Sequence, residues 1–362
     1  MIYRAIGSMS GSSLDGLDIV FAEFQENSGK WDHEIIHARC YPYSAEWKEK
    51  LKEAAFLNAL DYQLLHAEYG HYIGRQINSF IAENNLQFKI ALICSHGHTC
   101  FHAPAKKMAA QLGEGAAIAA ETELPVVSDL RSLDVAFGGQ GAPIVPIGEK
   151  LLMPGYDFFL NLGGIANLSF NAEPYLAFDV CPANRVLNML ANEVGKEFDD
   201  RGEIAATGNT DIELLNLLNA QEYYQLSYPK SLPNDFGTDR LYPLIRGAGI
   251  ELNDAMRTYV EHIVFQIKNA IHSLPFAMES GRLLATGGGA FNHFLIDRLK
   301  TELEKMKIEV IIPDPDRVKF KEATVMAFIG VLRWRQEYNV LSSVTGSSRN
   351  SIGGALWIGQ EA

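Results

Sequence analysis

The sequence predicts an α/β protein in which one architectural unit occurs twice, giving two domains. At 362 residues, the chain is longer than the usual size of a single hydrophobic core. Apolar runs typical of β-strands alternate with helical periodicities along most of the chain. Each half begins with a glycine-containing turn between two apolar runs, followed by a third such run and then helices. The halves share this order but no aligned letters, so the repeat is architectural.

The elements follow the same order in both halves. In the first half we expect strands near 2–9, 17–25 and 33–42, two helices between about 45 and 85, a strand at 89–94, and a short strand–helix–strand passage ending at Val127. In the second half we expect strands at 157–162, 165–170 and 175–178, mainly helices to about 275, a strand at 282–285, a helix at 290–305, a strand at 308–312 and a helix at 319–337.

Chain breakers place the domain boundary near residue 150. Glycines and a proline cluster at 137–143, and Pro154-Gly155 follows shortly after. We therefore expect a first domain at 1–150, joined by the C-terminal segment 338–362, and a second domain at 151–337.

Composition restricts the class of protein and of partner. Apolar residues make up 47% and charged residues 21%, which is typical of a fully folded globular chain. The net charge is −13 and no long run of Lys or Arg occurs, so we expect no nucleic-acid partner. A local pocket of backbone amides and Arg side chains can still bind a small anion.

Cysteine usage and hydropathy indicate the compartment. The four cysteines form no C-x-x-C pair and are too few to cross-link a chain of this length, so we expect reduced thiols. No run approaches the ~20 apolar residues that a membrane span needs. The first strand begins directly after Met1, and we expect a cytoplasmic protein without a membrane partner.

The first glycine turn suggests nucleotide chemistry. Residues 7–18 read Gly-Ser-Met-Ser-Gly-Ser-Ser-Leu-Asp-Gly-Leu-Asp. Its glycines permit a close backbone approach, and its amides and hydroxyls could bind phosphate. Asp15 and Asp18 would repel phosphate, but they could hold a magnesium ion or polarise a hydroxyl through water. The alternative is an ordinary Gly/Ser hairpin turn.

Two further glycine turns lie in the second half. Gly163 and Gly164 follow an apolar strand, where they could present amides to a nucleotide or simply form a tight hairpin. Gly287, Gly288 and Gly289 stand where a strand meets a helix, at the positive end of its dipole. This third turn lacks the Lys and Ser/Thr of a Walker A loop and the spacing of a Rossmann fingerprint, and it suits an adenosine or phosphate platform.

Two carboxylates are candidate catalytic or cleft residues. Asp179 is expected to end the third strand of the second half, just before a helix predicted from Pro182. A carboxylate at that place could act as a general base or cap the helix. Glu322 opens the predicted helix 319–337, either as a dipole partner in its first turn or as an acid in the cleft.

Histidines and an arginine in the first half suggest a sugar or anion site. Residues 94–102 contain three His and two Cys, but their spacing matches no standard zinc framework. His96 and His98 could hydrogen-bond to a sugar or pack in the core. Arg131 offers a guanidinium fork suited to a carboxylate or ring oxygens, and Asp129 could orient it or act in catalysis. A surface salt bridge is the alternative for Arg131.

Together these segments resemble the anhydro-N-acetylmuramic acid kinases, sugar kinases of the actin/hexokinase/Hsp70-like superfamily, nearly end to end. The first turn is similar to the family's G-x-M-S-G-T-S-x-D-G-x-D, with Ser12 in place of Thr. The other similar strings are S-H-G-H-T at 95–99, D-L-R-S-L-D-V-A-F-G-G-Q-G-A-P-I-V at 129–145, N-L-G-G-I-A-N at 161–167, G-G-G-A-F-N at 287–292 and E-A-T-V-M-A-F at 322–328.

The resemblance implies a duplicated actin-like ATPase (ribonuclease H-like) fold, with two domains around a cleft that holds ATP and Mg²⁺. It implies hydrolytic opening of the 1,6-anhydro ring of anhydro-N-acetylmuramic acid and phosphorylation of its 6-oxygen. Asp179 matches the base that activates water, while His98, Arg131 and Glu322 fall on substrate-binding positions. By analogy we also expect a homodimer. The implied nucleotide-binding residues are Gly11, Ser12, Ser13, Asp15, Gly16, Asp18, Gly163, Gly164, Gly287, Gly288, Gly289 and Asn292, with Asp15 and Asp18 as Mg²⁺ ligands.

Some positions differ from the family pattern. Val180, Cys181 and Ala183 replace Thr, Gly and Gly in the catalytic string F-D-T-G-P-G-N, and His98 replaces a Gln. The pattern D-x-x-G-x-x-A at 199–205 is kept. A kinase for another amino- or anhydro-sugar, and a non-catalytic sugar or nucleotide sensor, therefore stay open as alternatives.

Overall fold

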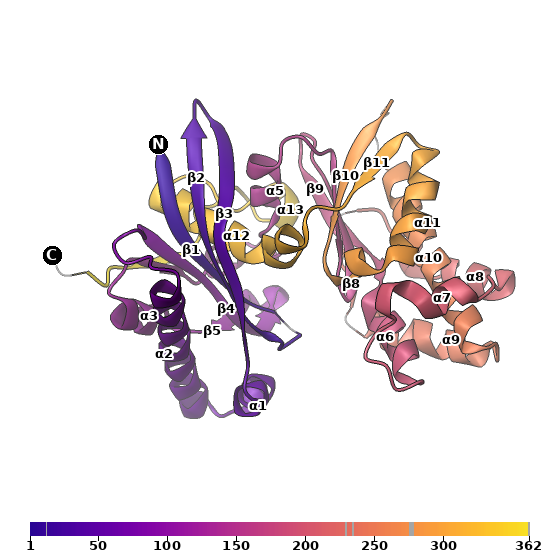
Figure 1. Ribbon diagram of the computed structural model, residues 1–362, viewed down its shortest axis with the longest axis horizontal. Coiled ribbons are helices and arrows are strands. Elements are labelled where there is room, and N and C mark those ends of the chain that lie inside the picture. The colour runs from indigo at the N-terminus through magenta and orange to yellow at the C-terminus, as the bar shows by residue number, and fades with distance from the viewer. Residues whose placement is uncertain (12, 229, 234, 275–278, 361–362) are drawn as a thin grey trace. The chain divides into compact units, whose positions relative to one another are not determined.

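The chain divides into two units (Figure 1). The computed structural model describes residues 1–11, 13–228, 230–233, 235–274 and 279–360. Unit 1 comprises Met1–Met153 and Phe320–Ala362, and unit 2 comprises Pro154–Lys319. The predicted domain ranges differ from these units in residues 151–153 and 320–337, which the sequence assigns to the second domain and the structure to unit 1. Apolar side chains of this segment, from Phe320 to Leu332, belong to the core of unit 1.

Unit 1 contains one mixed sheet with helices on both faces. Its strands are β1 (Ile2–Ser10), β2 (Gly16–Asn27), β3 (Lys30–Pro42), β4 (Leu92–Ala103), β5 (Met108–Leu112), β6 (Val126–Ser128) and β12 (Ala355–Trp357). Its helices are α1 (Ala45–Glu53), α2 (Ala59–Glu83), α3 (Gly115–Thr122), α4 (Ser132–Ala136), α5 (Pro146–Leu152) and α13 (Ser342–Thr345). A further helix, α12 (Pro315–Trp334), begins in unit 2 and continues in unit 1.

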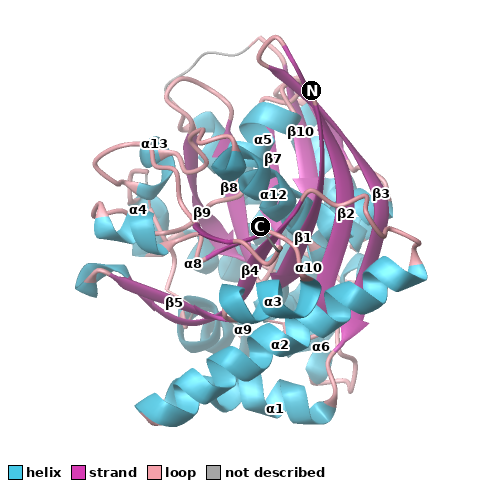
Figure 2. Ribbon diagram, turned by 90° about the vertical axis from the view of Figure 1, so that its left-hand side faces the viewer, coloured by secondary structure: helices cyan, strands magenta, loops and turns pink. Residues whose placement is uncertain are grey.

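The sheet of unit 1 has the order β12-β6-β4-β1-β2-β3, with β5 beside β4. Strands β1, β2 and β3 form an antiparallel meander, whereas β4 runs parallel to β1 and β6 runs parallel to β4. Alternate side chains point to opposite faces of the sheet. Ile6 and Ile93 therefore pack with α2 and α3 on one face, while Ala5 and Cys94 pack with α12 on the other (Figure 2).

Helix α12 approaches β1 and β4 closely because small residues line the contact. A Cβ atom placed on Gly7 would lie 1.9 Å from the carbonyl oxygen of Ala323 and 2.6 Å from the backbone nitrogen of Ala327. On the helix, a Cβ atom at Gly330 would lie 2.6 Å from Cβ of Cys94. The two backbones are therefore in contact at Gly7, and the helix backbone rests on the Cys94 side chain at Gly330, so neither place has room for a methyl group.

Unit 2 repeats the same strand order. Its strands are β7 (Phe158–Leu162), β8 (Ile165–Phe170), β9 (Leu176–Pro182), β10 (Gly281–Thr286) and β11 (Ile308–Ile311), in the order β11-β10-β7-β8-β9. Strands β7, β8 and β9 form an antiparallel meander, as β1, β2 and β3 do in unit 1. Strands β10 and β11 run parallel to β7, as β4 and β6 run parallel to β1. This shared ribonuclease H-like topology confirms the duplicated α/β fold predicted from the sequence.

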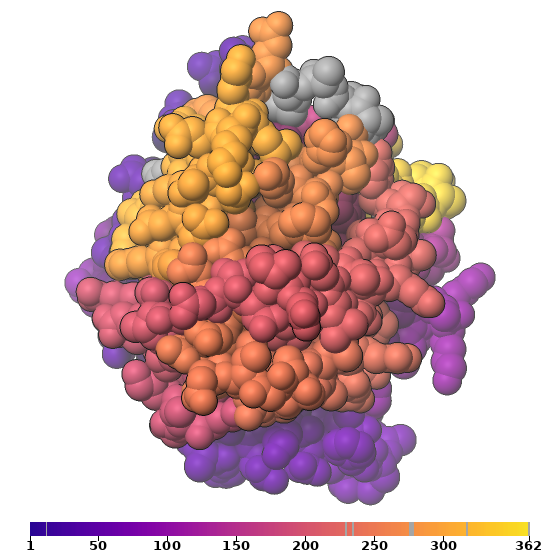
Figure 3. Space-filling view, turned by 90° about the vertical axis from the view of Figure 1, so that its right-hand side faces the viewer, coloured from indigo at the N-terminus to yellow at the C-terminus, as the bar shows by residue number. Residues whose placement is uncertain are grey.

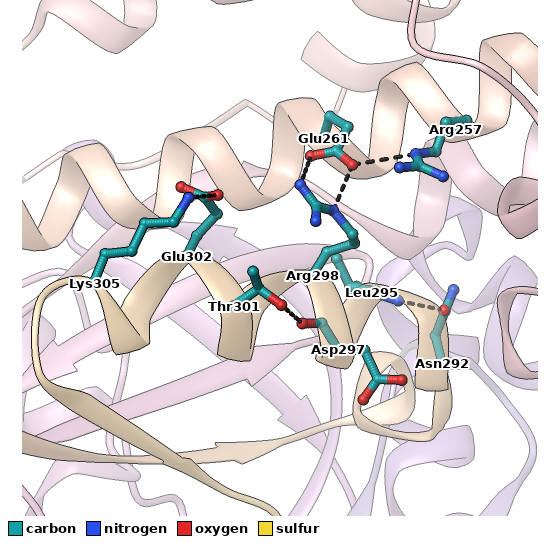
Figure 4. Close-up of polar contacts among 9 residues, drawn as sticks. All are labelled: Arg257, Glu261, Asn292, Leu295, Asp297, Arg298, Thr301, Glu302 and Lys305. Carbon is teal, nitrogen blue, oxygen red and sulfur yellow. Dashed lines mark hydrogen bonds and ion pairs between the residues drawn. The ribbon is translucent and has the colours of Figure 1, made fainter.

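Helices cover the sheet of unit 2, and ion pairs join α10 to α11, among them Lys268 with Glu302 at 2.8 Å. The helices are α6 (Asn184–Asn192), α7 (Glu203–Thr207), α8 (Ile212–Asn219), α9 (Tyr242–Gly247), α10 (Leu252–His272) and α11 (His293–Glu304), with the short helical turns η3 (Asp200–Gly202), η4 (Glu222–Gln225), η5 (Phe236–Leu241) and η6 (Gly288–Phe291). Glu261 of α10 accepts from Arg298 of α11 at 2.7 and 3.1 Å and from Arg257 at 3.2 Å (Figure 4). This cluster fixes α11 against the long helix.

Three predicted boundaries were wrong. Strand β4 runs from Leu92 to Ala103, beyond the predicted end at residue 94, because its polar second half pairs with β5. Strand β9 continues through Pro182, where a helix was expected to start, because its last residues pair with β8. Helix α12 begins at Pro315 instead of 319.

No helix in the described part of the chain is both long and apolar enough to span a membrane.

We predict that Gly7→Ala destabilises unit 1 by about 3 kcal/mol or more, since the new methyl group would overlap backbone atoms that cannot move independently. Thermal unfolding followed by circular dichroism should show an earlier transition. Gly247→Ala is the matched control, because nothing lies within 4 Å of its Cβ position. Equal melting of both variants and the unaltered protein would show that α12 does not rest on β1 as described.

Candidate active site

The first glycine turn connects β1 and β2 as a hairpin. Gly11 and Asp15 lie in its five-residue loop, with Ser13 exposed between them, whereas Ser12 lies outside the described residues. Gly16 begins β2, and its Cβ atom would lie 2.5 Å from the carbonyl oxygen of Tyr41, so strand packing accounts for this glycine. Asp18 lies within β2, paired with β1 and β3.

The second and third glycine turns are neighbours in unit 2. Strands β7 and β10 pair in parallel up to Asn161 and Thr286, so the turns that follow them meet at one edge of the sheet. Gly287 has a φ of 84° and packs against Leu162, which requires glycine for both reasons. The carbonyl groups of Gly163 and Gly164 accept from the first backbone amides of α6 at 2.8 to 3.4 Å.

Four of the predicted nucleotide-binding glycines have no packing requirement. At these positions the backbone is not in the left-handed region. The atom nearest to an added Cβ would lie 3.6 Å away at Gly11, 3.4 Å at Gly163, 3.8 Å at Gly164 and 3.5 Å at Gly288. By contrast, close internal contacts account for Gly16, Gly287 and Gly289. The fold therefore leaves bare backbone available to a ligand at four places.

Asn292 and Thr286 flank the third turn with different roles. Asn292 Oδ1 accepts from the backbone nitrogen of Leu295 at 2.9 Å, so this side chain caps α11 and only its amide NH₂ group could serve a ligand (Figure 4). The hydroxyl of Thr286 is buried and has no hydrogen-bond partner among the described residues. An unsatisfied buried hydroxyl is costly, so this one is a candidate ligand contact.

Asp179 lies inside β9, not at its end, opposite Asn167 of β8. Its Oδ2 accepts from the backbone nitrogen of Leu232 at 2.8 Å and from Ser231 Oγ at 3.3 Å, and its Oδ1 accepts from Asn167 Nδ2. The helix-capping alternative is excluded, because carbonyl groups of Gly163 and Gly164 occupy the first amides of α6.

The surroundings of Asp179 stabilise its protonated form over its carboxylate form, compared with an aspartate side chain in water. Burial raises the pKa of Asp179, while the hydrogen bonds from Leu232, Asn167 and Ser231 oppose that rise. The backbone is held as well, since its nitrogen donates to the carbonyl oxygen of Lys230 at 3.1 Å and its carbonyl oxygen accepts from Tyr223 Oη at 2.8 Å. The group is therefore both positioned and more basic than an exposed carboxylate.

Arg131 lies directly before α4 and is held by neutral groups of unit 1. Its Nε donates to His96 Nε2 at 2.9 Å, and its Nη1 donates to the carbonyl oxygen of Gly141 at 2.5 Å. Burial lowers the pKa of Arg131 to about 10, and the nearby carboxylates of Glu322 and Asp134 oppose that change. Since the guanidinium stays charged and makes no ion pair with a described residue, the surface salt-bridge alternative is excluded.

His96 supports Arg131 as a neutral imidazole. Burial is the largest cause that lowers its pKa to about 3, and the charge of Arg131 contributes. Nδ1 then carries the proton and donates to the carbonyl oxygen of Gly97 at 3.0 Å, which leaves Nε2 free to accept from Arg131. His96 thus fixes the direction of the guanidinium fork.

Glu322 lies two turns into α12. The interpretation as a first-turn dipole partner was wrong, because the helix starts seven residues earlier than this side chain. Its carboxylate makes no hydrogen bond with a described residue but lies near enough to Arg131 to act on its pKa. A half-buried cation and a carboxylate free of hydrogen bonds therefore lie close together.

A chain of hydroxyl groups orients His98. Tyr69 Oη lies 2.5 Å from Tyr43 Oη, Tyr43 Oη donates to Ser10 Oγ at 2.7 Å, and Ser10 Oγ lies 3.0 Å from His98 Nδ1. Burial lowers the pKa of His98, so the ring is neutral at pH 7. If Ser10 donates to Nδ1, the proton is on Nε2, which makes no hydrogen bond to a described residue.

The site residues fall into two groups. Unit 1 brings together Arg131 and Glu322 and carries His98 on the adjoining strand β4, along with the first turn. Unit 2 brings together the second and third turns and carries Asp179. Sequence reasoning missed the residues that orient two of the site side chains: Ser10 and Tyr43 for His98, and Asn167 and Ser231 for Asp179. Ser10 and Asn167 lie inside two of the motif strings. The described residues contain no group of three or more His, Cys, Asp or Glu side chains placed to bind a metal ion.

Comparison with known proteins gives a consistent family. The family model described as anhydro-N-acetylmuramic acid kinase matches residues 3–359. The anhydro-N-acetylmuramic acid kinase of Sulfurovum sp. is 32% identical over 98% of this chain and 99% of its own length, and that of Francisella tularensis subsp. novicida is 31% identical over 97% of each. Among solved structures, the (R)-2-hydroxyglutaryl-CoA dehydratase component A of Acidaminococcus fermentans is 12% identical, with a TM-score of 0.46 over 90% of this chain and 96% of its own. The chain belongs to the anhydro-N-acetylmuramic acid kinase family.

Proposed function

We propose that this chain uses ATP and water to convert anhydro-N-acetylmuramic acid to N-acetylmuramic acid 6-phosphate and ADP. The observation that carries the proposal is the setting of Asp179. Three hydrogen bonds position this carboxylate while burial raises its pKa, which is the arrangement that a general base requires. Family membership supplies the substrate.

The proposed reaction uses Asp179 to activate water. Asp179 takes a proton from water as the water oxygen attacks C1 of the anhydro sugar and the bond between C1 and O6 breaks. The freed O6 attacks the γ-phosphorus of ATP, and the bond from that phosphorus to the β–γ bridging oxygen breaks to release ADP. Leu232 and Asn167 hold the carboxylate in one orientation throughout, so one of its oxygens is directed at the water.

We propose that Arg131, His98 and Glu322 bind the sugar. Arg131 keeps guanidinium N–H groups free of described partners for a carboxylate such as the lactyl group. His98 offers Nε2–H as a donor, and Glu322 offers a carboxylate that can accept from a hydroxyl or an amide. A charged fork, a neutral donor and an acceptor together suit an N-acetylated sugar acid.

We propose that the three glycine turns bind ATP. Gly11, Gly163, Gly164 and Gly288 offer bare backbone, and Thr286 adds a buried hydroxyl that lacks a partner among the described residues. Gly16, Gly287 and Gly289 shape the turns, and Ser13 and Asn292 could add donors. Asp15 and Asp18 supply the carboxylate oxygens that Mg²⁺ prefers, with phosphate oxygens and water completing its shell. Bound Mg²⁺ would neutralise charge on the phosphates.

Two finer points follow from this proposal. Since ATP is a proposed substrate, we place the reaction in the cytoplasm, and by analogy with the family we propose a homodimer. The changed residues beside Asp179 are Val180, Cys181 and Ala183, and all three are buried, so they act on the packing around the proposed base. They favour, as the second candidate, a kinase for a related amino- or anhydro-sugar, which a panel of sugars would reveal.

We predict that Asp179→Asn lowers kcat about 10²- to 10⁴-fold, because an amide cannot accept the proton of water. Coupled ADP release with anhydro-N-acetylmuramic acid measures this, with N-acetylmuramic acid as the comparison substrate. Asp297→Asn, the same carboxylate–carboxamide exchange at an exposed position on α11, controls for the change of one atom. Full activity of Asp179→Asn would exclude Asp179 as the base, and absence of turnover on any sugar in the unaltered protein, with ATP still bound, would favour a sensor.

We predict that Ser231→Ala moves the acid limb of the pH profile of kcat/KM to higher pH. The base must be ionised to act, so activity falls as pH drops through the pKa of Asp179. The hydrogen bond from Ser231 lowers that pKa. Loss of this bond therefore raises the pKa of Asp179 and moves the acid limb to higher pH. Thr238→Ala, on the same segment but bonded only to Asp235 and Asp239, is the control. A limb that stays in place, or moves to lower pH, would contradict this assignment.

We predict that Tyr43→Phe raises KM for the sugar about five- to tenfold with little change in kcat, since losing one hydrogen bond of about 1 kcal/mol leaves the tautomer of His98 unfixed. Steady-state kinetics measures both constants. Tyr72→Phe is the matched control, because Tyr72 stacks on Tyr69 at 5.8 Å but its hydroxyl has no partner among the described residues. Equal effects of the two substitutions would point to packing instead of the hydroxyl chain.

A further inference from the structure

Unit 2 contains a pocket of about 680 Å³ that none of the proposed catalytic, sugar or nucleotide residues lines. It lies between the end of α8, the turn η4, the loop that follows η4 and the C-terminal part of α10, with Phe178 of β9 behind it. The helices of unit 2 that border it are among the red to orange segments in Figure 3.

The floor of the pocket is a fixed polar network. His262 is fully buried, and burial lowers its pKa to about 3, so its ring is neutral with one proton. Tyr224 Oη donates to His262 Nε2 at 3.0 Å, and His262 Nδ1 donates to Asn219 Oδ1 at 2.6 Å. Gln266 Nε2 donates to the same oxygen at 3.0 Å. These bonds set the orientation of both carboxamides.

The network leaves one donor and one acceptor for a ligand. Asn219 Nδ2 and Gln266 Oε1 make no hydrogen bond to a described residue, and both side chains line the pocket. Gln266 is only 5% exposed, so its oxygen is an acceptor in a largely dry setting. A neighbouring donor and acceptor of this kind match the carbonyl oxygen and N–H of a secondary amide.

The walls add an apolar surface and a positive charge. The rings of Phe178 and Tyr228 stack with centroids 5.4 Å apart, which provides a flat face for a methyl group or a sugar ring. The positive charge is that of Lys230, whose Nζ donates to the carbonyl oxygen of Tyr223 at 3.3 Å, lies 4.7 Å from the centroid of that ring, and keeps further N–H groups for a ligand. No Asp or Glu occurs among the described lining residues, although the chain carries a net charge of −13. A carboxylate on the ligand would therefore be favoured.

The segment that borders this pocket also holds Asp179. The carbonyl oxygen of Lys230 accepts from the backbone nitrogen of Asp179 at 3.1 Å, and Leu232 and Ser231 donate to its carboxylate. Tyr223, next to the pocket residue Tyr224, donates to the carbonyl oxygen of Asp179 at 2.8 Å. A ligand that shifts Tyr223 or residues 230–232 would thus change the position of the proposed base, a step that rests on the proposed function.

We propose that this pocket is a second small-molecule site, which binds an N-acetylated sugar acid and couples its occupancy to Asp179. The acetamido group pairs with Asn219 and Gln266, the ring or methyl group lies against Phe178 and Tyr228, and the carboxylate pairs with Lys230. The site therefore allows a compound of the same class as the substrate or product to regulate the reaction.

Calorimetric titration of the full chain carrying Arg131→Ala with N-acetylmuramic acid tests binding, because that substitution disables the proposed sugar site in unit 1. We expect saturable binding with one site. Adding Asn219→Asp keeps the acceptor oxygen but removes the donor and adds negative charge, and should weaken binding about tenfold or more. Asn192→Asp, an exposed position on α6, is the charge-matched control and should change nothing. Absence of saturable binding, or equal binding by the Asn219→Asp protein, would overturn the site.

Two further arms test the ligand class and the coupling. N-acetylglucosamine, which lacks the carboxylate, should bind more weakly than the acid, and Lys230→Gln should remove that difference; an unchanged preference would overturn the role of Lys230. In turnover assays of the Arg131-containing protein, N-acetylmuramic acid should lower kcat as well as raise KM, and Asn219→Asp should abolish the kcat effect. Purely competitive inhibition would overturn the coupling. If Asp179→Asn stayed fully active, the proposed function would fail while the binding titrations kept their meaning.

Discussion

The close contact of α12 with β1 and β4 is the constraint on which the candidate sugar site depends. The carbonyl oxygen of Ala323 occupies the place where a side chain on Gly7 would lie. This contact fixes the distance between the helix and the sheet at the residue that follows Glu322. Farther along, Gly330 rests on Cys94, two residues before His96, the imidazole that directs Arg131. The contact at Gly7 therefore positions the Glu322 carboxylate, and the contact at Gly330 acts through β4 on the Arg131 guanidinium. The buried ion pair between Lys321 and Glu149 at 2.9 Å fixes the same turn of the helix to α5.

The duplicated topology assigns different chemistry to equivalent places. The turn between the first and second strands is glycine-rich in both units, at 11–16 and at 163–164, and both turns offer backbone free of packing demands. In unit 2 the third strand carries Asp179, whereas in unit 1 the fourth strand carries His96 and His98. Long-range contacts then give each copy its own role. Tyr223, Ser231 and Leu232 donate to Asp179, and the Tyr69–Tyr43–Ser10 chain leads to His98. These contacts join residues 26 to 88 positions apart, so they are products of the fold.

The sequence was informative where a local pattern determined structure. Period-2 alternation located most strands, and glycine turns between them located both hairpins. Local rules were wrong at Asp179, where Pro182 suggested a helix start but the strand continues, because proline is tolerated at the end of this edge strand. They were also wrong for Glu322, because the helix begins upstream, at Pro315. Ser231 carried no sequence signal, since its bond to Asp179 spans 52 positions. The family strings identified Arg131 and Asp179, and they also contain His96 and Asn167, but nothing in the strings shows that these two side chains orient Arg131 and Asp179.

The central claim is that water, activated by Asp179, opens the anhydro ring while O6 receives the phosphoryl group. A single turnover in water enriched in ¹⁸O, analysed by mass spectrometry before the product can exchange its anomeric oxygen, tests this claim most directly. The account predicts one ¹⁸O atom in the sugar phosphate, on C1, and none in its phosphoryl group or in ADP. Label in free phosphate with the anhydro sugar unchanged, or a sugar phosphate without label on C1, would contradict it.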